Sequence, residues 1–301
     1  MKEIDRTLAE KGVPPPGRPL HAPLLLGEAF GWEGNILPPK ELAKQPGYSG
    51  DILMAKVHEW YTQTYGDKLK LDFALGYAPY RLLNAIWRVR VGLMYGTERI
   101  FADRNLEIRG RTLGTTGPAT FNALCAIEQL PKGLANRLTD DDIESYLNFC
   151  GLIFIFAWRD RLPKTNLLNM ARADYDTSTS DLIAHRYGQS RWATQQAVEK
   201  TLKGLLELSG TEFPRGTSGH DLLLLGEILA KTLNIALEPE LLKEAMCSAR
   251  VRYGEEPSTE TEAYRTNHAA LRILDKLRTD KNVSALLTGR RCKQHDVRRE
   301  K

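Results

Sequence analysis

The chain has 301 residues, of which 42% are hydrophobic, so it is long and apolar enough for two packed domains, which excludes a disordered protein. Lys and Arg total 42 against 38 Asp and Glu, a formal net charge of +4, so the overall charge does not indicate a nucleic-acid binder and any basic signal must be local. The four cysteines are scattered without a Cys-x-x-Cys pair, which favours a reducing, cytoplasmic location.

The hydrophobic segments are short. Charged residues interrupt every apolar run before Pro14, so the N-terminus lacks the apolar core of a signal peptide. The most apolar stretch, residues 151–158, is far shorter than the roughly 20 residues needed to cross a bilayer. We therefore expect a core segment there and no membrane association.

The first part of the chain, residues 1–162, is predicted to be an α+β domain. Pro and Gly are frequent in residues 1–50, which predicts irregular chain, whereas the apolar spacing of 51–65 predicts a helix. Apolar residues occupy alternate positions of 87–95, as in a half-buried strand. Its expected partners in a small antiparallel sheet are 100–102 and 106–109.

Two helices are expected after this sheet. One follows the turn region 114–117, with Pro118 at its first position, and the next begins at Thr139, which can cap free backbone amides. Three aspartates after Thr139 complement the positive end of the helix dipole. They could also suggest a magnesium site, but adjacent helical residues point about 100 degrees apart. Capping is therefore favoured, and no metal site is predicted.

Residues 163–279 are predicted to form a second, all-helical domain, because helical patterns alternate there with short polar connections. A helical hairpin is expected first, followed by a third helix opening at His220-Asp221, a fourth and a last that starts at Thr259, at capping-box spacing from Glu262. The hairpin helices are centred on 167–183 and 192–206, with Gly210 ending the second, and the fourth helix spans 241–249.

The predicted fold class is therefore α+β and mostly α. An N-terminal α+β domain of unknown function covers 1–162, a helical bundle covers 163–279, and a basic tail covers 280–301. The tail's Arg and Lys residues suggest a solvated terminus or, as an alternative, sequence-independent contacts to phosphate.

Five sequence elements of the second domain resemble the HEPN family in kind and order. They are Ala171-Arg172-Ala173-Asp174, residues 187–193, residues 195–206, His220-Asp221-Leu222 and Arg252-Tyr253. The resemblance implies a helical bundle that binds nucleotides or RNA, often dimerises, and works in prokaryotic defence or toxin-antitoxin-like stress systems, often beside a nucleotidyltransferase. We accordingly expect a homodimer. The sequence lacks that enzyme's pattern of a Gly-Ser followed by Asp-x-Asp, so such a partner would be another chain.

Some branches of the family are metal-independent ribonucleases with an Arg-x(4 to 6)-His motif, in which His exchanges a proton and Arg stabilises the phosphate. Arg215 and His220 have a matching spacing. The segment between them contains Gly, so the backbone next to Arg215 is flexible. Catalysis requires a closely fixed side chain, which such a segment does not provide. We therefore favour His220 as a cap of the third helix over a catalytic pair, and leave open whether the protein is an enzyme.

A polar stripe on the second helix of the bundle is the binding site that the sequence favours. Gln196, Glu199, Lys200 and Lys203 lie three or four residues apart and so share one helix face. The alternative is a solvated face with an ordinary Glu199 to Lys203 ion pair. The stripe is favoured for nucleotide or RNA binding, because the family resemblance is densest there.

Three functions remain open. They are a non-catalytic HEPN module that binds nucleotide, RNA or a partner enzyme, a metal-independent ribonuclease that uses Arg215 and His220, and a structural subunit of a larger complex. The sequence contains no phosphate-binding loop, dinucleotide turn or zinc-protease motif, so no cofactor is predicted.

Overall fold

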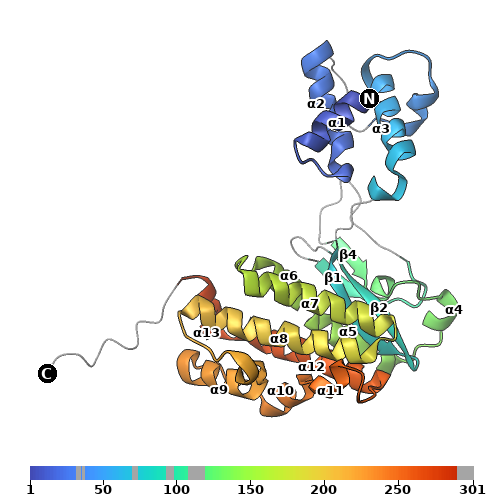
Figure 1. Cartoon of the computed structure of the whole chain (residues 1–301). Coiled ribbons are helices and arrows are strands. Elements are labelled where there is room, and N and C mark those ends of the chain that lie inside the picture. Colours follow the sequence, from blue (N-terminus) through green and yellow to red (C-terminus); the bar gives the residue numbers. More distant parts are fainter. Residues whose placement is uncertain (32–34, 36–37, 70–73, 93–97, 108–118, 290–301) are drawn as a thin grey trace. The chain divides into compact units, whose positions relative to one another are not determined.

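The computed structural model describes residues 1–31, 35, 38–69, 74–92, 98–107 and 119–289 (Figure 1). The chain forms two compact units, Met1–Phe73 and Ala74–Lys301. The observed boundary between the units lies just before the first strand, whereas the sequence analysis predicted a domain boundary at Pro163. Among the described residues, no helix combines the length and the apolar character needed to cross a membrane.

The first unit is built from α1 (Lys2–Glu10), α2 (Arg18–Phe30) and α3 (Gly50–Tyr65), joined by short 3-10 turns. The expectation of irregular chain over residues 1–50 was wrong, and that of a helix over 51–65 is confirmed. Proline frequency misled here: Pro19 lies in the first turn of α2, where a backbone N–H would have no helical partner, and Pro23 is accommodated within the same helix. The three helices share a small core: Leu8, Ala22, Leu26, Met54, Val57 and Tyr61.

The second unit begins with an antiparallel hairpin of β1 (Ala74–Leu82) and β2 (Ala85–Gly92). Leu83 and Asn84 form its turn with φ of 49° and 60°, the left-handed conformation of a two-residue hairpin. The predicted strand over 87–95 is confirmed in the described part by β2, and the small antiparallel sheet is present. The strand that pairs with β2 is β1, which the sequence analysis did not identify.

The expected strand at 100–102 is largely present as β3 (Glu98–Phe101), but the expected pairing and the strand at 106–107 were wrong. β3 pairs in parallel with β4 (Ala119–Asn122), and Leu106 and Glu107 are not in a strand. β4 and a 3-10 turn (Ala123–Ala126) replace the helix expected after Gly117. Residues 108–118, including Pro118 and the predicted turn, lie outside the described residues. Buried Asn122, at the end of β4, holds the chain just after β3 beside it. Its side-chain amide accepts from the N–H of Asp103 and donates to the Asp103 carbonyl.

Three helices follow: α4 (Lys132–Ala135), α5 (Asp140–Leu152) and α6 (Phe154–Arg161). The predicted helix start at Thr139 is confirmed as a capping box with Asp142. The backbone N–H and hydroxyl of Thr139 donate to the Asp142 carboxylate and lower its pKa.

The C-terminal helices follow the sequence prediction closely. They are α7 (Asn166–Ile183), α8 (Tyr187–Ser209), α9 (Leu222–Leu233), α10 (Pro239–Ala245), α11 (Ala249–Arg252), α12 (Glu260–Thr279) and α13 (Lys281–Leu287). The predicted fourth helix is divided into α10 and α11, and α13 occupies part of the expected tail. Residues 290–301, which hold most of the tail's basic residues, lie outside the described residues.

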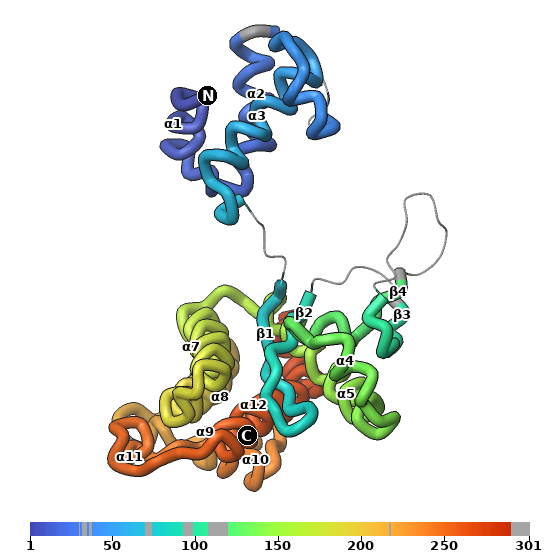
Figure 2. Tube along the Cα trace, turned by 90° about the vertical axis from the view of Figure 1, so that its right-hand side faces the viewer, coloured from blue at the N-terminus to red at the C-terminus, as the bar shows by residue number. Residues whose placement is uncertain are grey.

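A single hydrophobic core runs through the second unit, from Ala78 on β1 to Val283 on α13. β1 lies beside α7 (Figure 2), where the Thr179 hydroxyl donates to the Tyr77 carbonyl at 3.3 Å. A Cβ atom at Gly76 would lie 2.6 Å from the Phe156 ring, so only glycine allows this strand to approach α6 so closely. The hairpin and the helical bundle therefore share one core, which is why the second unit extends back to Ala74.

Candidate functional site

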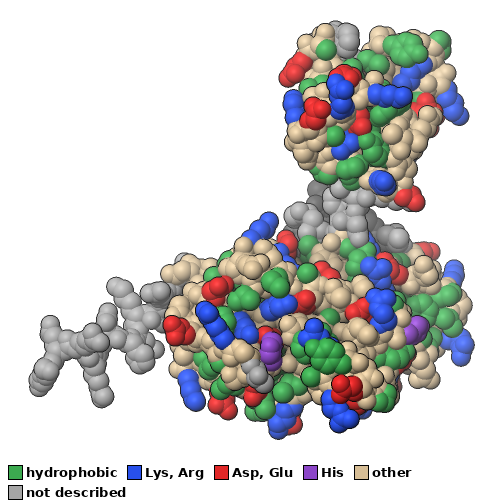
Figure 3. Space-filling view, in the orientation of Figure 1, with side chains coloured by type: hydrophobic (Ala, Val, Ile, Leu, Met, Phe, Trp, Pro, Cys, Tyr) green, Lys and Arg blue, Asp and Glu red, His purple; other side chains and the backbone are tan. Residues whose placement is uncertain are grey.

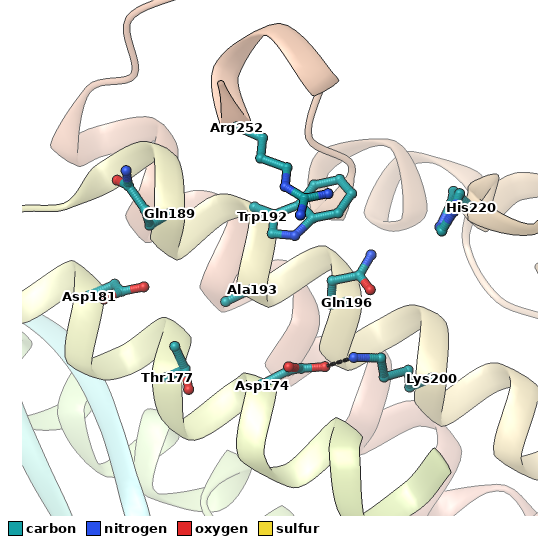
Figure 4. Close-up of a pocket in the computed structure, with 10 residues that line it drawn as sticks. All are labelled: Asp174, Thr177, Asp181, Gln189, Trp192, Ala193, Gln196, Lys200, His220 and Arg252. Carbon is teal, nitrogen blue, oxygen red and sulfur yellow. Dashed lines mark hydrogen bonds and ion pairs between the residues drawn. The ribbon is translucent and has the colours of Figure 1, made fainter. Parts of the chain in front are cut away.

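A hollow of about 550 Å³ opens between α7 and α8, with α11 and the loop before α9 on its rim (Figure 4). Its volume is within the range of small-ligand sites. The lining side chains are largely polar. They are Asp174, Thr177, Asp181, Gln189, Trp192, Ala193, Gln196, Lys200, His220 and Arg252.

Glu199 lies behind this hollow as the centre of a buried polar cluster, with its side chain only 4% exposed. One carboxylate oxygen lies 2.7 Å from the Lys203 ammonium. The other lies 2.9 Å from Nδ1 of His220 and 3.1 Å from the Gln196 amide nitrogen. A buried carboxylate needs such partners to offset its desolvation, and the cluster orients the His220 ring toward the hollow.

The two acids that line the hollow, Asp174 and Asp181, are each paired with a cation. The Lys200 ammonium lies 2.5 Å from the Asp174 carboxylate, and both groups line the hollow. Asp181 forms an ion pair with Arg186. A ligand therefore meets Asp174 and Asp181 as ion pairs and not as free carboxylates.

Arg252 is the cation of the hollow that has no acidic partner among the described residues. Its guanidinium lies 4.3 Å from the centroid of the Trp192 ring and 5.3 Å from that of Tyr253. Figure 4 shows the guanidinium stacked on the Trp192 indole, on the rim opposite Asp174 and Lys200. Arg252 is thus held by aromatic contacts that leave its positive charge available to an anion.

Close packing fixes the position of α11 against α8. A Cβ atom at Gly188 would lie 3.0 Å from the Val251 carbonyl oxygen, so a larger residue would press on the backbone of α11. The buried amide of Gln195 donates to the His220 carbonyl at 3.1 Å and accepts from the N–H of Cys247. Gln195 therefore ties the His220 loop and the start of α11 to the same turn of α8.

The structure separates the four residues of the predicted stripe. Gln196 and Lys200 line the hollow, whereas Glu199 and Lys203 form an ion pair behind it. The Lys203 side chain is only 12% exposed. Because its ammonium also lies 5.7 Å from the Phe213 ring, Lys203 is part of the packed interior and not of a solvated face.

Arg215 and His220 do not line a common hollow. His220 lines the hollow described above, whereas Arg215 lines a second one of about 530 Å³ beside the C-terminal end of α8, together with Glu207, Glu212 and Phe213. The prediction that His220 caps the third helix was wrong. Asp221 caps α9 by accepting from the N–H groups of Leu223 and Leu224.

Sequence reasoning missed Trp192, Arg252 and Asp174 as site residues. Each lies in a segment that carries the family resemblance, which was the available signal. Periodicity within α8 could not pair Trp192 with Arg252, because Arg252 lies on a different helix, far along the chain. Among the described residues, no group of three or more His, Cys, Asp or Glu side chains is placed to hold a metal ion.

Comparison with known proteins identifies the helical segment. The family model described as HEPN domain matches residues 165–280. The search of curated proteins and the search of solved structures each gave no match. The matched segment extends from the start of α7 to the end of α12 and contains every residue that lines the hollow. The C-terminal part of this chain is therefore a HEPN domain.

Proposed function

We propose that the HEPN domain is a non-catalytic binding module for a phosphate-bearing ligand of the nucleotide class, a nucleotide or RNA, held in the hollow between α7 and α8. The observation that carries this proposal is Arg252, a guanidinium stacked on Trp192 with no described carboxylate beside it. Guanidinium binds phosphate through two parallel hydrogen bonds, and an indole offers a flat apolar surface next to it.

The rest of the hollow supports a ligand with both polar and flat parts. The amides of Gln189 and Gln196 can donate and accept hydrogen bonds, and Lys200 can add a second positive contact while it stays paired with Asp174. On the face of the second unit shown in Figure 3, basic and acidic side chains are interspersed. Attraction to phosphate in the hollow depends on individual groups such as Arg252.

The ribonuclease alternative has one observation in its favour. A buried carboxylate on Nδ1 of His220 is an arrangement that orients a histidine for proton transfer. Against it, Arg215 lines the other hollow, so the two residues of the motif do not face one ligand. This separation favours binding over cleavage.

The remaining parts of the proposal rest on the family alone. They are a homodimer formed through the helical domain, a nucleotidyltransferase or other enzyme on another chain as partner, and a setting in defence or toxin-antitoxin-like systems. A purely structural subunit is the competing function. It predicts no nucleotide or RNA binding even at low salt.

Titration of the full chain with adenosine monophosphate at low salt, by calorimetry, tests the proposal. Arg252→Gln removes the free guanidinium and is expected to weaken binding about tenfold, because hydrogen bonds to charged groups contribute roughly 1.5–3 kcal/mol. Two matched variants serve as controls. Arg250→Gln alters an arginine on the same short helix whose side chain is 71% exposed, and Arg215→Gln alters the second hollow. Both should bind as the unchanged protein does.

Two outcomes would contradict the proposal. Equal affinities for all four proteins would remove Arg252 from the site. RNA cleavage that persists in chelator and is lost in both Arg215→Gln and His220→Ala would establish the ribonuclease instead.

A further inference from the structure

A second aromatic ring lies next to the hollow but outside it. Tyr253 directly follows Arg252 and is 70% exposed, one of the most exposed large hydrophobic residues of the described chain. The Arg252 guanidinium lies near both the Trp192 and the Tyr253 rings, at 4.3 and 5.3 Å from their centroids. One cation thus connects an aromatic ring inside the hollow with an aromatic ring on the surface.

The backbone around Tyr253 is held in place. The Ser248 hydroxyl caps α11 by accepting from the N–H of Val251, and Gly188 lets α11 pack directly on α8. The N–H of Tyr253 donates to the Ala249 carbonyl at 3.0 Å, and Gly254 then turns the chain with a φ of +74°. Tyr253 is therefore an exposed ring on a fixed backbone, which lowers the entropy cost of stacking a flat group on it.

We infer that the ligand of the HEPN domain is a single-stranded nucleic acid of at least two nucleotides, with one nucleotide in the hollow and the base of its neighbour stacked on Tyr253. This inference rests on the proposed function. Single-strand binding sites combine a cation for the backbone with aromatic rings on which successive bases stack, and Trp192, Arg252 and Tyr253 supply that combination. A free nucleotide in the hollow leaves Tyr253 unused, and a duplex keeps its bases paired and out of reach of the ring.

The test compares two ligands on the full-length protein. One is a fluorescently labelled oligoadenylate of about six nucleotides, followed by anisotropy, and the other is adenosine monophosphate, followed by calorimetry. Tyr253→Ala is expected to weaken oligoadenylate binding about tenfold and mononucleotide binding much less, because the nearer Trp192 ring still holds the Arg252 guanidinium. Tyr253→Trp should retain oligoadenylate binding, because it keeps a flat ring. Tyr48→Ala is the matched control, since Tyr48 is a 76% exposed tyrosine of the first unit.

The outcomes separate this inference from the proposed function. If neither ligand binds, the proposed function fails and the inference fails with it. If the mononucleotide binds but oligoadenylate binds no tighter, or if Tyr253→Ala and Tyr48→Ala behave alike, the inference alone is overturned. Equal binding of a polyglutamate peptide would also overturn it, because a peptide without rings cannot stack on Tyr253. A parallel series with oligodeoxyadenylate shows whether the 2′-hydroxyl contributes, and so whether the strand is RNA or DNA.

Discussion

The two hollows along α8 are nearly equal in volume, about 550 and 530 Å³, but differ in how their charges are compensated. In the hollow between α7 and α8 the acids are paired, and the cation left without an acidic partner among the described residues is Arg252. The hollow beside the C-terminal end of α8 combines Arg215 with Glu207 and Glu212. Cavity size does not distinguish the two, whereas the charge left uncompensated in each indicates which one suits a phosphate.

Lys203 is paired with buried Glu199, and reversing its charge is expected to have the largest effect. Lys203→Glu would place a carboxylate beside buried Glu199 and should lower the free energy of unfolding by about 3 kcal/mol or more, because breaking a buried pair leaves an uncompensated charge. Chemical denaturation measures this. The control is Lys231→Glu, at a lysine whose side chain is 77% exposed, with an expected change below about 1 kcal/mol. Equal losses in both variants would show that Lys203 behaves as a surface residue.

A smaller effect, confined to the Arg252 hollow, is expected from Gly188→Ala. The added methyl group would lie 3.0 Å from the Val251 carbonyl oxygen and should push α11, with Arg252, away from α8. We expect a stability loss of about 1 kcal/mol and weaker nucleotide binding. Gly151→Ala is the control, because its Cβ meets nothing within 4 Å in helix α5 and alanine favours helix. If Gly188→Ala binds nucleotide as the unchanged protein does, the position of α11 does not matter to the site.

The smallest effect concerns His268, which lines neither of the two hollows. Its pKa is lowered, first by burial and then by nearby Arg272, whereas Glu244 opposes the shift. The unfolded chain therefore binds the proton more readily, and the free energy of unfolding should fall as pH drops below about 6.5, until the folded-state pKa is passed. His268→Gln should flatten this part of the stability profile, measured by denaturation at several pH values. An unchanged profile would assign the pH dependence to other groups.

Local signals explain why much of the fold was predictable. The capping boxes at Thr139 and Thr259 join residues three positions apart, so the sequence alone locates the starts of α5 and α12. The apolar spacing of α7 and α8 and the left-handed Gly210 that ends α8 are equally local. Pro19 misled the prediction for α2, because its effect depends on its place within a helix.

The candidate site was only partly predictable. Residues of the HEPN resemblance supplied Gln196, Lys200 and His220, all of which line the hollow. The spacing of the stripe could not show that Lys203 points to a buried carboxylate, because burial depends on what packs against α8. Nor could it join Trp192 to Arg252, which meet because α11 packs closely on α8 beside Gly188.

The sequence by itself determined the helices of the bundle, their caps and the family to which residues 165–280 belong. These features depend on residues close along the chain or on a pattern within one segment. The tertiary structure alone decided the β1 pairing, the shared core from Ala78 to Val283 and the charge balance of each hollow. Those depend on residues far apart in sequence, and whether a charge stays free for a ligand is fixed by the neighbours that folding brings to it.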